Sequence, residues 1–421
     1  MSSLDLQLAE HAASVRFENL SAAAIERAKV FTLDTIGVGI AGGSTPEIAP
    51  LLQAVQGWGE GRQVGLWGTR RTFSPGQAVL LNAYQIHCQE FDCLHEGAVL
   101  HAMATLLPVL LAEAQVRGGV SGKALLAAVA GLANLRGLDA QRTLAAFGHQ
   151  LAQVSGTMQG HTEGSVVLPL QVGMNARAAL QSCDLAQSGF PSLQLPLTGR
   201  FGYLPMFETQ WDLEPHLKTL GETWRIAELS HKPYPSGRAT HGGIEGLMVL
   251  RDQIGFGADE IEQIIVRGPS LINHLVNRPP VKSPSPNYAR LCMPFALAKV
   301  LQHGSLDPMH FRGDALHDPQ TFVLSQKVSM QIDDNPNPNA LAPQVVSVRL
   351  RDGRVLEHAI DTMLASPKRP LSEEARMKKF QRCWSLAAEP MGDSAALMAA
   401  INGLEHCRDI QEVTTLLAAQ S

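Results

Sequence analysis

Residues 20–43, LSAAAIERAKVFTLDTIGVGIAGG, decide the fold class of the N-terminal half of the chain. Apolar residues recur at the spacing of a helix, Ser21 is a suitable N-cap, and Gly42 and Gly43 are suitable residues to end a helix. The sequence therefore predicts an almost unbroken array of helices in this half. Further helical patterns continue to about residue 190, over 78–91, 102–116, 121–132, 140–154 and 172–188.

The helix predicted over 20–43 contains GVGIAG, residues 37–42, which matches the GxGxxG pattern of dinucleotide-binding loops. Such a loop needs a strand before it, a helix after it and a βαβ unit around it. Here a helix precedes the glycines, and no pattern of parallel strands follows. We therefore interpret these glycines as positions of close helix packing and of a helix end.

The pattern of the sequence changes near residue 232. Residues 261–268 and 327–333 have the pattern of strands, and residues 344–360 alternate around Asp352-Gly353, a favoured hairpin turn. We predict a mainly α protein with a smaller α+β domain. The all-helical domain is built from both chain ends, 1–231 together with 367–421, and the α+β lid domain covers 232–366. A cleft between two such domains is a common place for a small-molecule site.

Composition argues against several classes of protein. The chain has 421 residues, of which 45% are hydrophobic and 5% aromatic, as suits a large helix-rich core. The net charge of −5, without a run of five Lys or Arg, argues against nucleic acid as a partner. The N-terminus has no secretory h-region, the apolar stretches are too short for a membrane span, and the cysteines form no CxxC pair. We expect a cytoplasmic protein with reduced thiols and no membrane contact.

The stretch EFDCLHEGAVLH, residues 90–101, gathers ionisable groups between two helical patterns. Glu90, Asp92 and His95 lie on the predicted turn that closes one helix. His101 opens the next helix, where the helix dipole favours a neutral imidazole that can act as a base. We interpret this cluster as a candidate for proton chemistry, and an ordinary polar loop between helices is the alternative.

Other chemistry at this loop has weaker support. The set His87, Cys88, Cys93 and His95 fits no common zinc spacing, so we predict no metal. The chain has neither the GxSxG pattern of a serine nucleophile nor the Walker pattern. Cys93 as a nucleophile stays open, although a lone cysteine in a helical protein is more often a small buried hydrophobe.

A second constellation is HKPYPSGRATHGGIEG, residues 231–246. Lys232, Arg238 and His241 lie within ten residues at the predicted start of a helix, behind two stiffening prolines. Cations beside free backbone N–H groups can hold a carboxylate or a phosphate, and we expect them to face the 90–101 loop across the cleft. A solvated basic loop is the alternative. Tyr288 and Arg290 open a later apolar helix, and a buried arginine there would need an anionic partner.

Taken in order, these segments resemble the MmgE/PrpD family, which includes 2-methylcitrate dehydratases, cis-aconitate decarboxylases and iminodisuccinate epimerases. The resemblance implies a helical domain with a lid, a homodimer, no metal or organic cofactor, and acid–base chemistry next to carboxylates. Carried over residue by residue, it implies an acidic loop at Phe91-Asp92, a loop histidine at His101, a lid lysine at Lys232 and a following histidine at His241. The matching segments are 31–42, 91–102, 121–132, 231–244 and 287–304.

The chain also departs from the family pattern. It has Asp92-Cys93-Leu94 where the family usually has Asp-Asp-Thr, and Glu90 where the family has Asp. A longer helical segment with a further active-site histidine is missing after residue 132. Residues 167–173, VLPLQVG, replace a Thr-Lys-x-Leu-His-x-Gly pattern, so that a lysine and a histidine are lost. His161 and Glu163 are candidates to replace lost groups, with a polar turn as the alternative.

These observations leave three classes of function open. The first is a lyase, either a dehydratase or a decarboxylase, acting on a small di- or tricarboxylate. The second is an epimerase or isomerase of a related carboxylate. The third is a catalytically silent paralogue that binds or assembles, which the missing segment favours.

Overall fold

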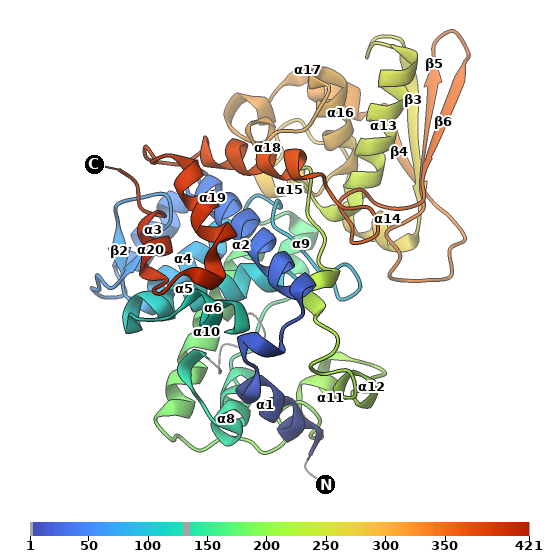
Figure 1. Cartoon of the computed structure of the whole chain (residues 1–421). Helices are drawn as coiled ribbons and strands as arrows, with labels where there is room; N and C mark the ends of the chain where they lie inside the picture. The colour runs from blue at the N-terminus through green and yellow to red at the C-terminus, as the bar shows by residue number, and fades with distance from the viewer. Residues whose placement is uncertain (1–2, 129–134, 421) are drawn as a thin grey trace.

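The computed structural model describes residues 3–128 and 135–420, and Figure 1 shows a mainly helical molecule with one small mixed sheet in its C-terminal region. The helix predicted over 121–132 is described only as far as Ala128; its last four residues lie outside the described residues. The N-terminal helices are α1 (Leu4–Ser14), α2 (Ala22–Gly42), α3 (Ile48–Gln56), α4 (Pro75–His87), α5 (Ala102–Arg117), α6 (Gly122–Ala128), α8 (Ala140–Leu151), α9 (Gln159–Glu163) and α10 (Val167–Gln187).

Helix α2 lies at the centre of the helical part. The Ser21 hydroxyl caps it by accepting the backbone N–H of Ala24 at 3.2 Å. Its glycines allow neighbours to approach closely: a Cβ on Gly39 would lie 2.9 Å from the Trp67 ring, and one on Gly42 would lie 1.9 Å from the carbonyl oxygen of Gln85. The GxGxxG match therefore lies within a packed helix, with no phosphate-binding loop.

The lid region contains a four-stranded sheet in the order β4-β3-β5-β6. Strand β3 (Ile261–Gly268) pairs in parallel with β4 (Val328–Ile332) and antiparallel with β5 (Gln344–Leu350), which forms a hairpin with β6 (Val355–Ile360). The predicted strands are all present. The helices of this part are α13 (His241–Ile254), α14 (Ser270–Val276), α15 (Pro286–Arg290), α16 (Met293–His303) and α17 (Pro319–Ser325).

The remaining elements are short. Strands β1 (Val64–Gly65) and β2 (Thr72–Phe73) form a small hairpin, and helices α11 (Tyr203–Phe207) and α12 (Glu214–Leu217) precede the lid. The 3-10 helices are η1 (Phe17–Asn19), η2 (Arg225–Glu228), η3 (Arg238–Thr240), η4 (Pro308–Phe311), η5 (Gly313–Leu316) and η6 (Leu404–His406).

The C-terminal helices α18 (Glu373–Trp384), α19 (Ser394–Asn402) and α20 (Gln411–Thr415) return to the N-terminal helices (Figure 1). Lys379 of α18 pairs with Asp34 of α2 at 2.7 Å, and Lys29 of α2 donates to the Asn402 carbonyl at 2.9 Å. These contacts support our proposed division into a helical domain from both chain ends and a lid.

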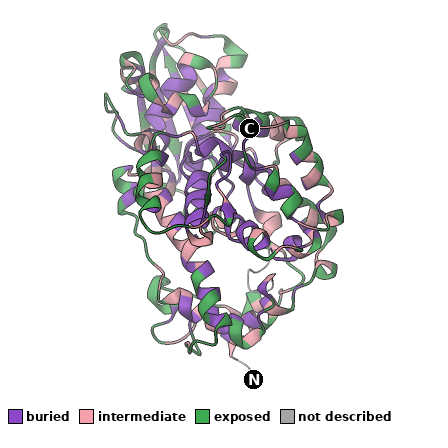
Figure 2. Cartoon of the chain, turned by 90° about the vertical axis from the view of Figure 1, so that its left-hand side faces the viewer, coloured by how far each residue is buried: buried purple, intermediate pink, exposed green. Residues whose placement is uncertain are grey.

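Buried residues form separate hydrophobic clusters on the two sides of that division. One large cluster surrounds α2 and α5, and another fills the space between the sheet and helices α13 and α16. Figure 2 shows the buried residues concentrated in the sheet-bearing part and where it meets the helices, with more exposed residues near α1 and α8. Within the part of the chain that the structure describes, no helix combines the length and apolar character needed to cross a membrane.

Candidate active site

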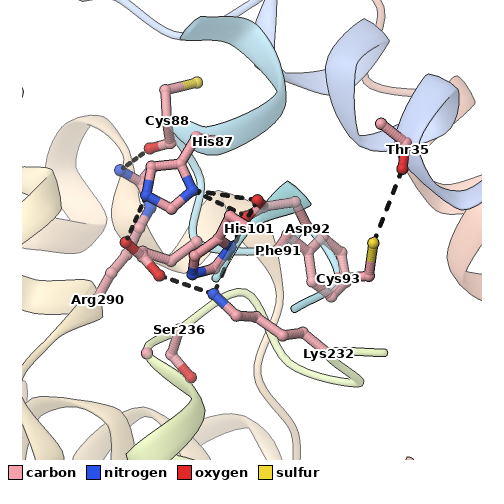
Figure 3. Close-up of polar contacts among 12 residues, drawn as sticks. Thr35, His87, Cys88, Phe91, Asp92, Cys93, His101, Lys232, Ser236 and Arg290 are labelled. Atoms are coloured by element: carbon pink, nitrogen blue, oxygen red, sulfur yellow. Dashed lines mark hydrogen bonds and ion pairs between the residues drawn. The ribbon is translucent and has the colours of Figure 1, made fainter. Parts of the chain in front are cut away.

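Two histidines meet at one buried carboxylate (Figure 3). Asp92 accepts the Nδ1–H of His101 at 2.8 Å and the Nδ1–H of His87 at 3.1 Å. Lys232 lies beside them, with its Nζ 2.7 Å from Glu90 and 4.0 Å from Asp92. His87 ends α4, His101 precedes α5, and Lys232 comes from the segment that leads into the lid, so three separate parts of the chain build this cluster.

Backbone pairing explains why Lys232 reaches the 90–101 loop. Leu94 and Ser230 form an antiparallel bridge, with N–H···O distances of 3.1 and 2.8 Å in the two directions. In antiparallel pairing, the residue two before Leu94 lies opposite the residue two after Ser230. Asp92 therefore lies opposite Lys232. From the other side, Lys379 donates to the Phe91 carbonyl at 2.9 Å, which fixes the loop to α18.

The turn between α4 and the loop is strained at Glu90. This residue has φ = 51°, in the left-handed region that a non-glycine residue seldom adopts. Its carboxylate is buried, lies 3.5 Å from Nε2 of His87, and accepts a hydrogen bond from Lys232. Strain of this kind persists where surrounding contacts determine the conformation, and it is frequent at functional sites.

The two carboxylates of the cluster stay ionised. Burial opposes their charge, but His101 and His87 hold the pKa of Asp92 well below its usual range. Burial likewise opposes the charge of Glu90, but Lys232 and His87 lower the pKa of Glu90 to about 2. Each negative charge is thus matched by a cation or an N–H donor in contact with it.

The pKa values of the two histidines move in opposite directions. Burial opposes a charge on His87, but Asp92 and Glu90 outweigh it and raise the pKa of His87. Burial lowers the pKa of His101, helped by His87 and Lys232 and opposed by Asp92. The protonated form is therefore favoured at His87 and the neutral form at His101. Because His101 donates its Nδ1–H to Asp92, its Nε2 carries the free lone pair.

A cavity of about 160 Å³ opens beside this cluster between the helical part and the lid. This volume is below the roughly 300 to 1,000 Å³ of pockets for drug-sized ligands, so only a small molecule fits. One side is polar and the other is mostly aliphatic. The polar residues that line it are His87, Glu90, Glu96, His101, His161, Lys232 and Arg238.

The structure separates the predicted site residues into those that line this cavity and those that do not. His101, Glu90, His161, Lys232 and Arg238 line it, and Asp92, with 0% exposure, lies behind the imidazoles. The other predicted residues are His95, His241, Tyr288 and Arg290, and their side chains are engaged elsewhere.

Three of these four have partners outside the cavity lining. His95 Nε2 lies 2.8 Å from Glu228, the Tyr288 hydroxyl donates to the Pro279 carbonyl at 2.8 Å, and Arg290 donates to the Cys88 carbonyl at 3.0 Å. The partner that we expected for the buried Arg290 is thus the backbone at the end of α4 rather than a carboxylate.

His241 lies behind Arg238 and positions it. Its Nδ1 accepts from the Arg238 guanidinium at 3.2 Å, and its Nε2–H donates to the Ser236 carbonyl at 3.2 Å. Burial, Arg238 and Lys232 keep the pKa of His241 well below its usual range, so the imidazole is neutral.

The replacement candidates from the 160–165 turn lie in different places. His161 lines the cavity, and burial together with Arg278 lowers its pKa. Glu163 is exposed and accepts a hydrogen bond from Gln159. Leu168, where the family pattern has lysine, also lines the cavity, whereas Gln171 donates to the Thr157 carbonyl at 3.3 Å.

Two residues of the cavity lining, His87 and Glu96, are not among the site residues predicted from the sequence. His87 was considered only as a zinc ligand. The signal in the sequence is the position of Glu90 and Asp92, three and five residues after His87. His87 is the last residue of its helix, and the turn that follows a helix end can bring such residues back to its side chain. Glu96 lies in the same loop and pairs with Arg238 at 2.7 Å.

The geometry of the loop disfavours a catalytic role for its cysteines. Cys88 and Cys93 do not join the histidine cluster: the Cys88 thiol contacts the Gln85 carbonyl, and the Cys93 thiol lies 3.9 Å from the Thr35 hydroxyl. Burial raises the pKa of the Cys93 thiol and excludes it from solvent, which disfavours it as a nucleophile.

One group of described residues has ligand atoms close enough to share a metal ion. These atoms, from His87, Asp92 and His101, lie within 4.8 Å of one another. The Lys232 ammonium, 4.0 Å from Asp92, would repel a metal cation there. We therefore interpret the group as a hydrogen-bonded triad.

Comparison with known proteins supplies the family. Residues 6–131 and 123–216 match the MmgE/PrpD N-terminal domain, and residues 234–398 match the MmgE/PrpD C-terminal domain. The chain belongs to the MmgE/PrpD family.

Similar proteins include the cis-aconitate decarboxylase of Mus musculus, 25% identical over 97% of this chain and 92% of the relative. The cis-aconitate decarboxylase of Homo sapiens is 25% identical over 94% of this chain and 91% of the relative. The cis-aconitate decarboxylase-like protein oryM of Aspergillus oryzae is 23% identical over 96% and 94%.

These comparisons also bear on the missing segment. The N-terminal domain matches in two stretches that meet at 123–131, close to the expected gap. The alignment with the mouse relative extends over 467 positions, more than the 421 residues of this chain. The mouse relative therefore carries residues that have no counterpart here.

Proposed function

We propose that this chain is a lyase that acts on a small carboxylate by acid–base chemistry at a carbon next to the carboxylate group. The observation that carries the proposal is the sharing of Asp92 by two histidines with opposed pKa shifts, beside a cavity that also contains Lys232. Environments that push the pKa values of neighbouring groups apart are a general way to pair a base with an acid.

His101 is the proposed base. Asp92 holds its Nδ1–H, so Nε2 can take a proton from a substrate carbon. A C–H next to a carboxylate is a weak acid, and its electron pair moves toward the carboxylate as the proton leaves. The guanidinium of Arg238, which lines the cavity beside the partly exposed Glu96, can bind this carboxylate and stabilise the developing charge.

His87 is the proposed acid. In an elimination, the electron pair forms a double bond, and the leaving group departs with a proton. In a decarboxylation, the bond to the carboxylate breaks, CO₂ leaves, and the electron pair on carbon takes up a proton. A protonated His87 can supply the proton in either reaction, and the names of the similar decarboxylases favour the second.

One observation favours a second candidate function. His161 lines the same cavity as His101, and its lowered pKa keeps it neutral. An epimerase needs a neutral base on one face of a substrate carbon and a protonated acid on the other, because the proton leaves from one face and returns to the other. Neutral His161 and protonated His87 both line the cavity and would supply such a pair. A silent paralogue is the remaining alternative.

The test is incubation with a panel of mono-, di- and tricarboxylates in D₂O, followed by NMR. Loss of CO₂ or alkene formation supports the lyase, and deuterium exchange with inversion but no elimination supports the epimerase. His101→Ala should abolish an elimination or a deuterium exchange, which break a C–H bond, and His87→Gln should abolish a decarboxylation, which needs the acid. The matched control is Cys93→Ser, a buried residue of the same loop that does not line the cavity, and it should remain active. Absence of any reaction across the panel would refute the proposal.

The family supports two further proposals. The division into a helical domain, 1–231 with 367–421, and a lid, 232–366, places the cavity at the domain boundary, where closure could exclude water. The homodimer implied by the family is a separate prediction, which sedimentation velocity of the purified chain would test.

A further inference from the structure

We infer that the ligand of this cavity carries a single free carboxylate and an apolar body, in contrast to a tricarboxylate such as cis-aconitate. The inference rests on the proposed function, since it names the substrate class of the same site. Two independent features carry it: the charges that line the cavity already cancel, and the rest of its wall is aliphatic.

The lysine and the arginine of the cavity lining are already paired. Lys232 lies 2.7 Å from Glu90, and Arg238 lies 2.7 Å from Glu96. The two carboxylates line the cavity together with their partners, so the lining adds no net positive charge from these groups. His87 also lines the cavity, and Asp92 offsets its charge when it is protonated.

Two other arginines near the site do not line the cavity. Arg290 donates to the Cys88 carbonyl, and Arg278 donates to the carbonyls of His161 and Thr162. Neither guanidinium belongs to the cavity lining. A ligand with three carboxylates would therefore lose its hydration without gaining matching cations, and buried charges without partners are strongly unfavourable.

A single carboxylate can be accommodated, because one of the two ion pairs can open. The side chain of Glu96 is 25% exposed, so it can turn to solvent and release Arg238. The side chain of Glu90 is only 6% exposed and stays with Lys232. The geometry thus provides one carboxylate position, at Arg238, and none for a second or third.

The aliphatic wall fits the rest of such a ligand. Leu271 and Leu275, one turn apart on α14, line the cavity from the lid, together with Leu341. Met158 and Leu168 line it from the helical part. An apolar wall offers no hydrogen bonds to carboxylates, whereas each ligand methylene that it buries can improve binding roughly 10-fold.

The test uses three acids of related skeleton in isothermal titration: 2-hexenoate with one carboxylate, glutaconate with two, and cis-aconitate with three. Binding is measured with whichever of the full-length His101→Ala and His87→Gln variants lacks activity, so that turnover does not interfere. We expect 2-hexenoate to bind at least about 10-fold more tightly than glutaconate, and cis-aconitate to bind most weakly. Tightest binding of cis-aconitate, or no binding of any acid, would overturn the inference.

Two charge variants sharpen the test. Glu96→Gln releases Arg238, and Leu168→Lys adds a cation to the aliphatic wall, so each should shift the preference toward glutaconate by about 10-fold or more. Leu193→Lys is the matched control: its side chain is exposed and outside the cavity, and its addition of the same charge should leave the ranking unchanged. If neither cavity variant moves the ranking while both remain folded by thermal melting, the charge argument is wrong.

The result of this binding test does not depend on the result of the turnover test of the proposed function. Preferential binding of 2-hexenoate without turnover of any carboxylate would leave this inference standing and refute the lyase. Turnover of cis-aconitate with tightest binding of the same acid would support the lyase and refute this inference.

Discussion

Replacing Asp92 by Asn should disable the base without changing the shape of the site. Asp92 accepts Nδ1–H bonds from both His101 and His87. Both rings contact the same oxygen, Oδ2, and His87 also contacts Oδ1 at 3.2 Å. An amide must put its NH₂ group at one of these two positions, and a ring that faces the NH₂ group loses its acceptor. If that ring is His101, its proton moves to Nε2, and the atom that should take the substrate proton becomes a donor.

The expected magnitude follows from these two bonds. A base held in the wrong tautomer should lower kcat by roughly 10²- to 10⁴-fold, by analogy with the carboxylate–histidine pair of serine proteases. Two hydrogen bonds to a buried charge are also lost, while the cost of burying that charge is removed. We therefore expect the free energy of unfolding to fall by about 2 to 4 kcal/mol.

The assay combines turnover with a direct view of the ring. Histidine-labelled ¹⁵N NMR reports the tautomer of His101, and turnover is measured on the acid that the D₂O panel identifies. Cys93→Ser, the neighbouring buried substitution, should keep both the tautomer and kcat. An Asp92→Asn variant with kcat within about threefold of the parent and an unchanged His101 tautomer would refute the assignment of His101 as the base.

Three further predictions concern stability, measured by urea unfolding. Lys232 is 1% exposed and pairs with Glu90, so Lys232→Ala should cost about 3 to 5 kcal/mol, and Lys232→Met combined with Glu90→Gln should cost clearly less. Gly42→Ala should cost about 2 to 3 kcal/mol, because the new Cβ would lie 1.9 Å from the Gln85 carbonyl oxygen; full stability would contradict the packing described for α2. The raised pKa of His87 stabilises the folded state below its unfolded pKa of about 6.5, and this contribution is lost as the pH rises through the folded pKa. The stability difference between the parent and His87→Gln should thus shrink above pH 6.5, and a constant difference would contradict the raised pKa.

The burial of Lys232 changes an expectation drawn from the sequence. The sequence places Lys232 on a cationic loop that faces the substrate, where its loss should weaken binding more than folding. In the structure it is fully buried against Glu90, so its removal affects folding as well. The burial of Lys232 cannot be predicted from the sequence, because the carboxylate that compensates its charge comes from a residue 142 positions away.

Local patterns were sufficient for the secondary structure. Helical spacing predicted α2 from its Ser21 cap to its glycine end, and alternation around Asp352-Gly353 predicted the β5–β6 hairpin. These signals are local because caps, turns and side-chain periodicity act over a few residues. The parallel pairing of β3 with β4 is not local, and only the strands themselves could be predicted.

Only part of the candidate site could be predicted from the sequence, because long-range contacts assemble it. The 90–101 loop and Lys232 stand out by composition, but the bridge between Leu94 and Ser230 that aligns them is a long-range contact. Arg290 was expected to have an anionic partner, and a backbone carbonyl at the end of α4 accepts one of its N–H groups instead. The partner of a buried arginine depends on three-dimensional packing, which cannot be predicted from the spacing of residues in the sequence.

Two departures from the family pattern, Leu168 and Gln171, lie outside the cluster around Asp92. Leu168, in place of lysine, lines the cavity, and Gln171, in place of histidine, bonds to the backbone of the preceding turn. Neither position contacts Asp92, whose hydrogen bonds orient His101 and His87 through the loop and α4 alone. The groups that would move a proton can therefore keep their geometry while the wall that contacts the rest of the ligand changes. Under the proposed function, the acid–base groups stay at Asp92, while Leu168 presents an aliphatic side chain to the cavity where the family pattern has a lysine. Ligand charge is therefore the first property to vary in a search for its substrate.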